Sequence, residues 1–269
     1  MEKMKQLLKK SKLAKRLYDR LRLESILRSK KDYWLIPSYF EDYVIPEVNT
    51  PYLNWKVKAR YDFQLSLFDH LAHNVGRGLV VDLGDNNGFF LNYLFTTCPA
   101  VYNKKGNLYG VNVDGVAVDR IMDKGFVGVH GNIEWFIKSN LWNTQVDLVL
   151  MFQTLEHLEN PIQVLKDLRE NVKVRGLIIT VPYRRVSRVG FHHLRHPEDW
   201  VNRGDLTADD IHTFELCPED WGLIFKYIGW EVLYENTYYQ YPKGNVFSWL
   251  LGKYWAKYDY EGFTGFVLK

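Results

Sequence analysis

Unbroken apolar runs alternate with helical stretches from Leu79 to Pro182, and this alternation limits the folds open to the chain. The runs read LVVDLG, NLYGVNV, GFVGVHGN, VDLVLMF and GLIITVP. Helical segments are predicted between them over residues 89–96, 116–124 and 161–174. Strands without polar alternation are typical of a parallel sheet that helices cover on both faces. We therefore predict an α/β fold.

The first run passes directly into a glycine-containing turn and a helical stretch in VVDLGDNNGFFLNYL, residues 80–94. In open α/β sheets a ligand binds beyond the carboxyl ends of the strands, where the strand order reverses. Gly84 and Gly88 allow a tight turn and close backbone approach, and the helix that follows offers its N-terminus. Together with the motifs below, this stretch predicts a site for a nucleotide-like cofactor.

The motifs, in their order and spacing, resemble those of class I S-adenosylmethionine-dependent methyltransferases. VVDLGDNNG resembles the family's first motif in its G-x-N-x-G variant, and LYGVNVDG and GVHGNIEWF resemble the second and third strand ends. The stretch from VDLVLMFQTLEHLENP to GLIITVPY resembles the fourth and fifth strands. HTFELCPEDWGLIFKYIGWEVL resembles a late motif of small-molecule methyltransferases, including quinone O-methyltransferases.

This resemblance implies a Rossmann-like seven-stranded methyltransferase sheet with helices on both faces and an N-terminal helical extension. GWEVLYENTYY and GFTGFVLK would form its last antiparallel pair. It also implies S-adenosyl-L-methionine as cofactor. The cofactor-binding residues implied are Asp82, Gly84, Asp85, Asn86, Gly88, Asn112, Asp114, Asn132, Ile133 and Phe152.

Two of these residues depart from the family's pattern. Asn112 stands where an acid normally binds the ribose hydroxyls, and Asn132 replaces the acid beside adenine. An amide can still accept and donate hydrogen bonds, but charge-assisted bonds are about twice as strong as neutral ones. We expect cofactor binding to be weakened and not abolished, or Asp114 to reach the ribose instead.

His157 and His212 are the candidate catalytic residues. Methyl transfer is an in-line displacement that depends mostly on positioning and on excluding water. A general base matters when the acceptor is a weakly acidic alcohol, and histidine suits that task at neutral pH. His212 opens the late motif on the acceptor side. His157 follows the fourth strand and either acts there too or braces the motif loops.

The segment after the fifth strand carries histidines and arginines. In the run HHLRH (His192, His193 and His196), His192 and His196 would converge on a metal only within a helix, and hard cations prefer carboxylates, so we predict no metal site. The arginines either suit an acidic acceptor or form a solvated loop. They are Arg184, Arg185, Arg188, Arg195 and Arg203. Tyrosines and tryptophans from Tyr238 onward either pack against the acceptor's rings or fill the core.

Residues 1–31 hold twelve Lys or Arg and three acids, a net charge of +9, so the remainder of this +3 chain carries −6. Their apolar residues recur at helical spacing, which predicts a basic amphipathic helix. We expect a connecting segment and helix over 32–75 and the methyltransferase domain over 76–269. The basic helix either packs on its own domain, docks on an anionic membrane or binds nucleic acid.

The favoured function is methyl transfer to an oxygen of a small-molecule or glycan-like acceptor, of sugar or quinone type. The alternatives are a catalytically silent scaffold and a nucleic-acid methyltransferase. The last is disfavoured because MFQTLEH stands where enzymes that methylate base amines often carry a D/N-P-P-Y/F motif. Two cysteines and no apolar run of about 20 residues suggest a cytoplasmic protein, peripheral at the inner membrane face if the basic helix docks there.

Overall fold

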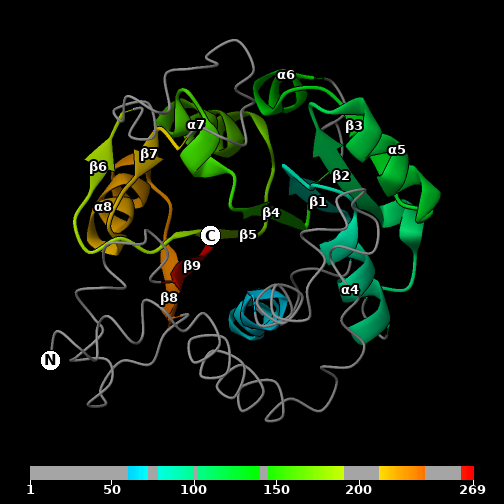
Figure 1. Ribbon diagram of the computed structural model, residues 1–269, viewed down its shortest axis with the longest axis horizontal. Helices are drawn as coiled ribbons and strands as arrows, with labels where there is room; N and C mark the ends of the chain where they lie inside the picture. The colour runs from blue at the N-terminus through cyan, green and yellow to red at the C-terminus, as the bar shows by residue number, and fades with distance from the viewer. Residues whose placement is uncertain (1–59, 72–77, 100–101, 140–144, 191–211, 240–261) are drawn as a thin grey trace, which may run out of the picture. The chain divides into compact units, whose positions relative to one another are not determined.

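The computed structural model of the chain describes residues 60–71, 78–99, 102–139, 145–190, 212–239 and 262–269 (Figure 1). The chain divides into two compact units, residues 1–65 and 66–269. Residues 60–67 are helical, and a 3-10 turn, η2, follows at Phe68–His70. Outside the described residues lie the predicted basic helix, most of the connecting segment, the histidines of HHLRH, two arginines (Arg195 and Arg203) and most of the late aromatic residues.

A seven-stranded sheet forms the centre of the second unit, with the order β3-β2-β1-β4-β5-β9-β8. Its five parallel strands are β1 (Val80–Leu83), β2 (Leu108–Asn112), β3 (Val127–His130), β4 (Leu148–Phe152) and β5 (Leu177–Pro182). β9 (Gly262–Leu268) and β8 (Val232–Tyr239) complete it as antiparallel strands. The predicted sheet is thereby confirmed, including its last pair.

The order of the strands reverses between β1 and β4, which are neighbours although β2 and β3 separate them in the chain. Their carboxyl ends form the switch point at which α/β sheets bind ligands. All residues of β1 and β5 are buried, which explains why their sequences lack a polar alternation.

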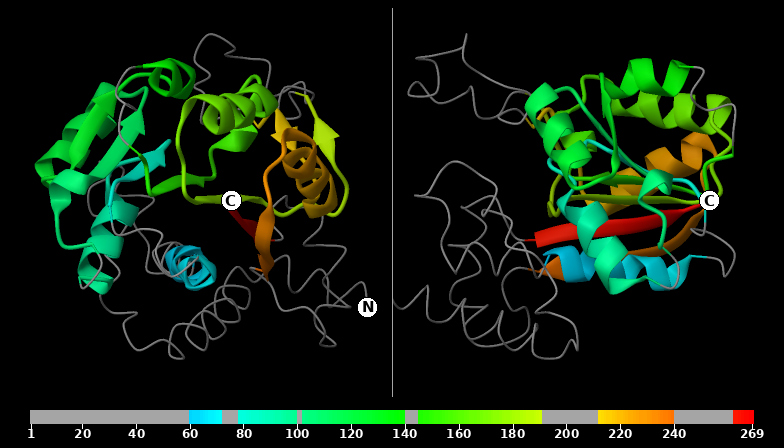
Figure 2. Two further views of the ribbon diagram at one scale, coloured as in Figure 1. Left: turned by 180° about the vertical axis from the view of Figure 1, so that it is seen from behind. Right: turned by 90° about the vertical axis from the view of Figure 1, so that its right-hand side faces the viewer.

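Helices cover the sheet on both faces. α6 (Ile133–Lys138), α7 (Pro161–Asn171) and α8 (Pro218–Ile228) contribute Phe136, Leu165, Trp221 and Phe225 to one core with Met151 of β4. α4 (Phe89–Thr97) lies on the opposite face of the sheet (Figure 2), and α5 (Gly115–Asp123) packs on β2 and β3. No helix within the described ranges is long and apolar enough to cross a bilayer.

Three details differ from the sequence-based expectation, and the first is the short helix α6, which was not predicted. α7 ends at Asn171 and not at Val174, because Val174 enters a parallel bridge with Val146. A small antiparallel sheet of β6 (Arg188–Val189) and β7 (Phe214–Glu215) was not predicted. The backbone N–H of Thr213 donates to the carbonyl oxygen of Glu156 at 2.7 Å, which ties this small sheet to the loop after β4.

Candidate active site

The loop between β1 and α4 turns on two glycines in the left-handed region, Gly84 with φ 87° and Gly88 with φ 72°. A Cβ at Gly84 would lie 2.5 Å from Oγ1 of Thr154, whose hydroxyl donates to the carbonyl oxygen of Leu83 at 3.0 Å. A side chain at position 84 would therefore combine backbone strain with a collision. The loop thus packs closely on Thr154 and leads into the N-terminus of α4, the kind of place where nucleotide-like ligands bind.

Asp85 holds this loop from inside. Its Oδ1 accepts a hydrogen bond from the backbone N–H of Gly88 at 2.9 Å, and the residue is only 4% exposed. Its Oδ2 has no hydrogen-bond partner among the described residues and would lie 2.6 Å from a Cβ at Gly110. The carboxyl group therefore lies between the loop and β2.

Burial shifts the ionisation of two neighbouring carboxyl groups. Desolvation raises the pKa of Asp85 to about 7, although the N–H groups of Gly88 and Asn87 and the ammonium of Lys124 favour its ionised form. The pKa of Asp82 on β1 lies well above its ordinary value, because of burial and of the negative charge on Asp85. Near neutral pH the pair therefore carries less than its full negative charge.

The residues predicted to bind the ribose brace the loop. Asn112 donates from Nδ2 to the carbonyl oxygen of Asp85 and accepts at Oδ1 from the N–H of Asp114, both at 2.8 Å. Asp114 caps α5 by accepting at 2.9 Å from the N–H of Val116. β2 ends at Asn112, so the extended run that would have placed Asn112 and Asp114 on one face stops there.

The other predicted cofactor residues lie along the same edge. Asn132 caps α6, accepting at Oδ1 from a backbone N–H of the first turn at 2.7 Å. Ile133 is buried, Asn86 is half-buried, and the Phe152 ring meets a ring of α4 edge-on with centroids 4.7 Å apart. Cofactor binding by these residues stays a prediction.

Gln153, directly after β4, is the non-glycine residue with positive φ, 56°, in the described part of the chain. Its N–H donates to the carbonyl oxygen of Thr180 at 2.8 Å, and its side-chain amide donates to Oγ1 of Thr180 at 3.2 Å. Backbone conformations of this kind concentrate at functional sites. The turn leads straight into Glu156 and His157, and no sequence signal had pointed to it.

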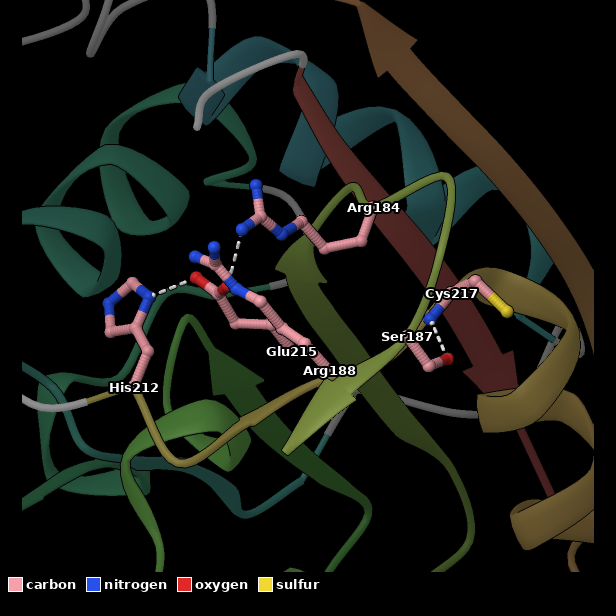
Figure 3. Close-up of polar contacts among 6 residues, drawn as sticks. All are labelled: Arg184, Ser187, Arg188, His212, Glu215 and Cys217. Atoms are coloured by element: carbon pink, nitrogen blue, oxygen red, sulfur yellow. Dashed lines mark hydrogen bonds and ion pairs between the residues drawn. The ribbon is translucent and has the colours of Figure 1, made fainter. Parts of the chain in front are cut away.

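A second group of polar side chains, from the segment after β5 and from the β6–β7 sheet, meets at Glu215 (Figure 3). Glu215, whose side chain is 3% exposed, pairs with Arg184 at 2.8 Å, with Nδ1 of His212 at 2.7 Å, and with Arg188. The ring centroids of His157 and His212 lie 4.6 Å apart, with the rings 87° from parallel. The structure therefore brings together the two histidines that the sequence proposed as catalytic.

Known proteins share this architecture. The family model described as "Methionine biosynthesis protein MetW" matches residues 65–197, just under half of the chain. A SAM-dependent methyltransferase from Archaeoglobus fulgidus is 16% identical with a TM-score of 0.50, over 78% of this chain and 94% of that one. The fold is that of the class I SAM-dependent methyltransferases.

Two further solved structures with this methyltransferase fold are similar. A SAM-dependent methyltransferase from Leishmania major is 11% identical with a TM-score of 0.55, over 92% of this chain and 82% of that one. The [4+2]-cyclase SpnF is 12% identical with a TM-score of 0.54, over 80% and 82%. A search of the curated proteins found no match.

Of the five arginines noted after β5, Arg184 and Arg188 are not freely solvated, whereas Arg185 is exposed. The side chains of Arg184 and Arg188 are 11% and 24% exposed, and both pair with the buried carboxylate of Glu215. Two guanidinium groups therefore face the single carboxylate of Glu215, and the buried carboxyl group of Glu156 lies beside the same histidines. The sequence analysis did not identify Glu215 as a site residue. The only local signal was that it follows His212 by three residues.

Ser187 fixes the same segment to the start of α8 (Figure 3). Its Oγ accepts from the backbone N–H of Cys217 at 2.8 Å, and its hydroxyl donates to Asp220. Because Cys217 is the N-cap residue of α8 and has no side-chain capping bond, Ser187 supplies part of that cap from a distant part of the chain.

Proposed function

We propose that the protein is an S-adenosyl-L-methionine-dependent methyltransferase that methylates an oxygen of a small-molecule or glycan-like acceptor, of sugar or quinone type. The observation that carries this proposal is the glycine loop at the switch point between β1 and β4, where position 84 has no room for a side chain. The MetW match and the similar methyltransferase structures support the same proposal.

The residues at this edge fit the cofactor. Gly84, which is half-buried, gives a cofactor room to approach the backbone before α4, and Asn112 and Asn132 each retain an amide hydrogen beyond their bracing bonds. When bound, the cofactor supplies an electrophilic methyl group on a sulfonium sulfur. The chain's own task is then to orient the acceptor and exclude water.

His157 and His212 act on the acceptor hydroxyl. The bond from Nδ1 of His212 to Glu215 fixes the tautomer that leaves Nε2 able to accept a proton, on the side of the ring away from Glu215 (Figure 3). With the cofactor bound, methyl transfer to the acceptor oxygen would break the carbon–sulfur bond, and Nε2 of His212 would take the hydroxyl proton. Arg184 and Arg188, which lie near His212 through Glu215, would suit an acidic acceptor.

Isothermal titration of the full chain with S-adenosylhomocysteine tests this proposal. We expect one molecule to bind per chain with micromolar affinity. Transfer of label from methyl-tritiated cofactor to glycan or lipid fractions, and not to RNA, would then support the oxygen acceptor. Absence of binding at millimolar ligand would contradict the proposal.

That outcome would favour a second candidate, a catalytically silent scaffold. The observation that favours it is that the side chains of Asn112 and Asp114 already form hydrogen bonds to backbone groups of this chain. The methyltransferase fold also supports more than one chemistry, as the similarity to a [4+2]-cyclase illustrates.

The basic segment of residues 1–31 motivates a further part of the proposal, peripheral contact with an anionic membrane. Each basic residue near such a surface contributes about 1 kcal/mol of attraction, which salt weakens. Co-sedimentation with anionic vesicles should exceed that of a truncation beginning at Asp32, at low salt only. Equal, negligible pelleting of both proteins would refute membrane contact.

A further inference from the structure

We propose that Glu156, His157 and His212 bind a divalent transition-metal ion of the Zn²⁺, Co²⁺ or Fe²⁺ class, and that this ion holds the acceptor oxygen. One potential ligand atom from each of these residues lies within 4.8 Å of the other two. Ligand atoms at about 2.1 Å from a tetrahedral metal are about 3.4 Å apart, so small side-chain rotations complete the site.

The donor set selects the class of metal. Two imidazole nitrogens and one carboxylate oxygen are a poor set for Mg²⁺ or Ca²⁺, which prefer all-oxygen ligands. Imidazole favours zinc, iron and their neighbours in the first transition row. Three protein ligands also leave one position open, which is the arrangement of catalytic and not of structural metal sites.

The orientation of His212 is an independent observation for the same site. Its Nδ1 contacts the buried carboxylate of Glu215 at 2.7 Å, and Arg184 and Arg188 hold that carboxylate in turn (Figure 3). Metal-binding histidines commonly donate their second ring nitrogen to a carboxylate, which fixes the ring and its tautomer. Glu215 therefore prepares Nε2 of His212 to bind a cation.

The backbone also holds the ligand residues together. The N–H of Thr213, next to His212, donates to the carbonyl oxygen of Glu156 at 2.7 Å. Glu156 is only 1% exposed, and a cation beside it would offset the cost of burying its negative charge. The three residues thus share one small volume although His212 is distant from the other two in sequence.

Metal binding can be measured without methyl transfer, but the metal uses the same two histidines, so its role rests on the proposed function. An ion held by Glu156, His157 and His212 would lower the pKa of an acceptor hydroxyl, so that its proton would pass to solvent. Methyl transfer to that oxygen would break the carbon–sulfur bond of the cofactor. His212 serves in this route as a ligand and not as the base.

Titration of the chelator-stripped full chain with Co²⁺ and Zn²⁺ tests the proposal, followed by visible absorption and calorimetry. We expect one equivalent to bind, with cobalt absorption bands that report nitrogen and oxygen ligands. His157→Gln, His212→Gln and Glu156→Gln should each weaken binding by about 100-fold or more. Glu215→Gln should weaken it by about 10-fold to 100-fold, as expected when the partner of a ligand is lost.

Two controls separate this site from adventitious binding by other histidines. His70→Ala removes an imidazole that is stacked on Tyr234 outside the cluster, and should leave the affinity unchanged. The triple variant His192→Ala, His193→Ala, His196→Ala should also leave it unchanged. Circular dichroism of each variant confirms that it is folded.

Three results would overturn the proposal. They are the absence of binding at millimolar metal, unchanged binding in His157→Gln and His212→Gln, and loss of binding in the triple variant alone. S-adenosylhomocysteine titration of the same metal-free protein keeps the two proposals distinct. Binding of that ligand without binding of metal would remove the metal site and leave the methyltransferase function standing.

Discussion

The two halves of the site use their polar side chains in different ways. On the proposed cofactor side, Asp85, Asn112, Asp114 and Asn132 each hold a backbone group of a loop or helix start. On the proposed acceptor side, Glu215 holds other side chains, a histidine and two arginines. In the first half, side chains hydrogen-bond to the backbone and hold its conformation. In the second half, charged side chains form a network of ion pairs around Glu215.

This difference explains why asparagine can stand at two positions where the family has acids. Asn112 donates a hydrogen bond to a carbonyl oxygen, which an aspartate could not do. A brace needs the right donors and acceptors and not a net charge. An acid at Glu215 cannot be replaced by an amide in the same way, because the guanidinium groups of Arg184 and Arg188 would lose their buried counter-charge.

The largest effect is expected on the acceptor side, from Glu215→Gln. Arg184 and Arg188 would lose their buried counter-charge, and breaking a buried ion pair costs about 3 kcal/mol of unfolding free energy. Urea denaturation measures this loss, with Glu170→Gln on the exposed surface of α7 as the control. S-adenosylhomocysteine affinity should change by less than about threefold. A loss of stability no greater than that of the control would refute the charge network.

On the cofactor side, Gly84→Ala should reduce S-adenosylhomocysteine affinity by about 100-fold, or 2.7 kcal/mol. The new Cβ would need a left-handed backbone and would collide with Thr154, so the loop must move. Gly106→Ala is the matched control, because a Cβ there meets nothing within 4 Å. Titration calorimetry compares the two variants, and equal affinities would show that the loop does not form the binding surface.

The substitution Asp85→Asn tests how burial of this carboxyl group changes the stability of the protein with pH. The folded-state pKa of Asp85, about 7, lies above the ordinary value of 3.8, so its contribution to stability is greatest at acidic pH. That contribution is lost as pH rises from about 4 to about 7. Relative to the wild type, the variant should therefore gain about 2 kcal/mol of unfolding free energy between pH 5 and pH 7. A stability difference that is constant across this range would contradict the assigned burial effect.

Asn112→Asp should not improve cofactor binding, although it restores the family's usual acid. The new carboxylate would face the carbonyl oxygen of Asp85 and lose a hydrogen bond worth about 1 kcal/mol. Asn132→Asp is the contrasting control, because aspartate caps a helix as well as asparagine does. Denaturation and calorimetry should show a destabilised Asn112→Asp and an unchanged Asn132→Asp. Tighter S-adenosylhomocysteine binding by Asn112→Asp would disprove the bracing role.

Most of the sheet was predictable because each buried strand carries its own signal. The residues of β1 and β5 are all buried, and the apolar runs of the sequence mark them directly. α6 and the β6–β7 sheet were missed, since six residues and two pairs of residues are too short for a periodicity. The end of α7 was misplaced because the bridge of Val174 to Val146 is a tertiary contact.

The sequence predicted several residues of the candidate site, but it did not predict the hydrogen bonds and ion pairs that these residues form. His157 and His212 followed from motif positions, and the structure places their rings together. The roles of Asn112 and Asp114 as braces depend on where β2 ends, and the ion pairs of Glu215 join residues far apart in the chain. Such contacts arise from the fold as a whole and leave little trace in local sequence.

A crystal structure of the full chain with S-adenosylhomocysteine tests the central claim most directly. We predict that the ligand lies against the backbone of residues 84–88 at the N-terminus of α4. The bonds from Asp85 to Gly88 and from Asn112 to the Asp85 carbonyl should stay unbroken, and the ligand's sulfur should face His157 and His212. A ligand bound elsewhere, or bound only after Asp85 or Asn112 releases the loop, would contradict the account.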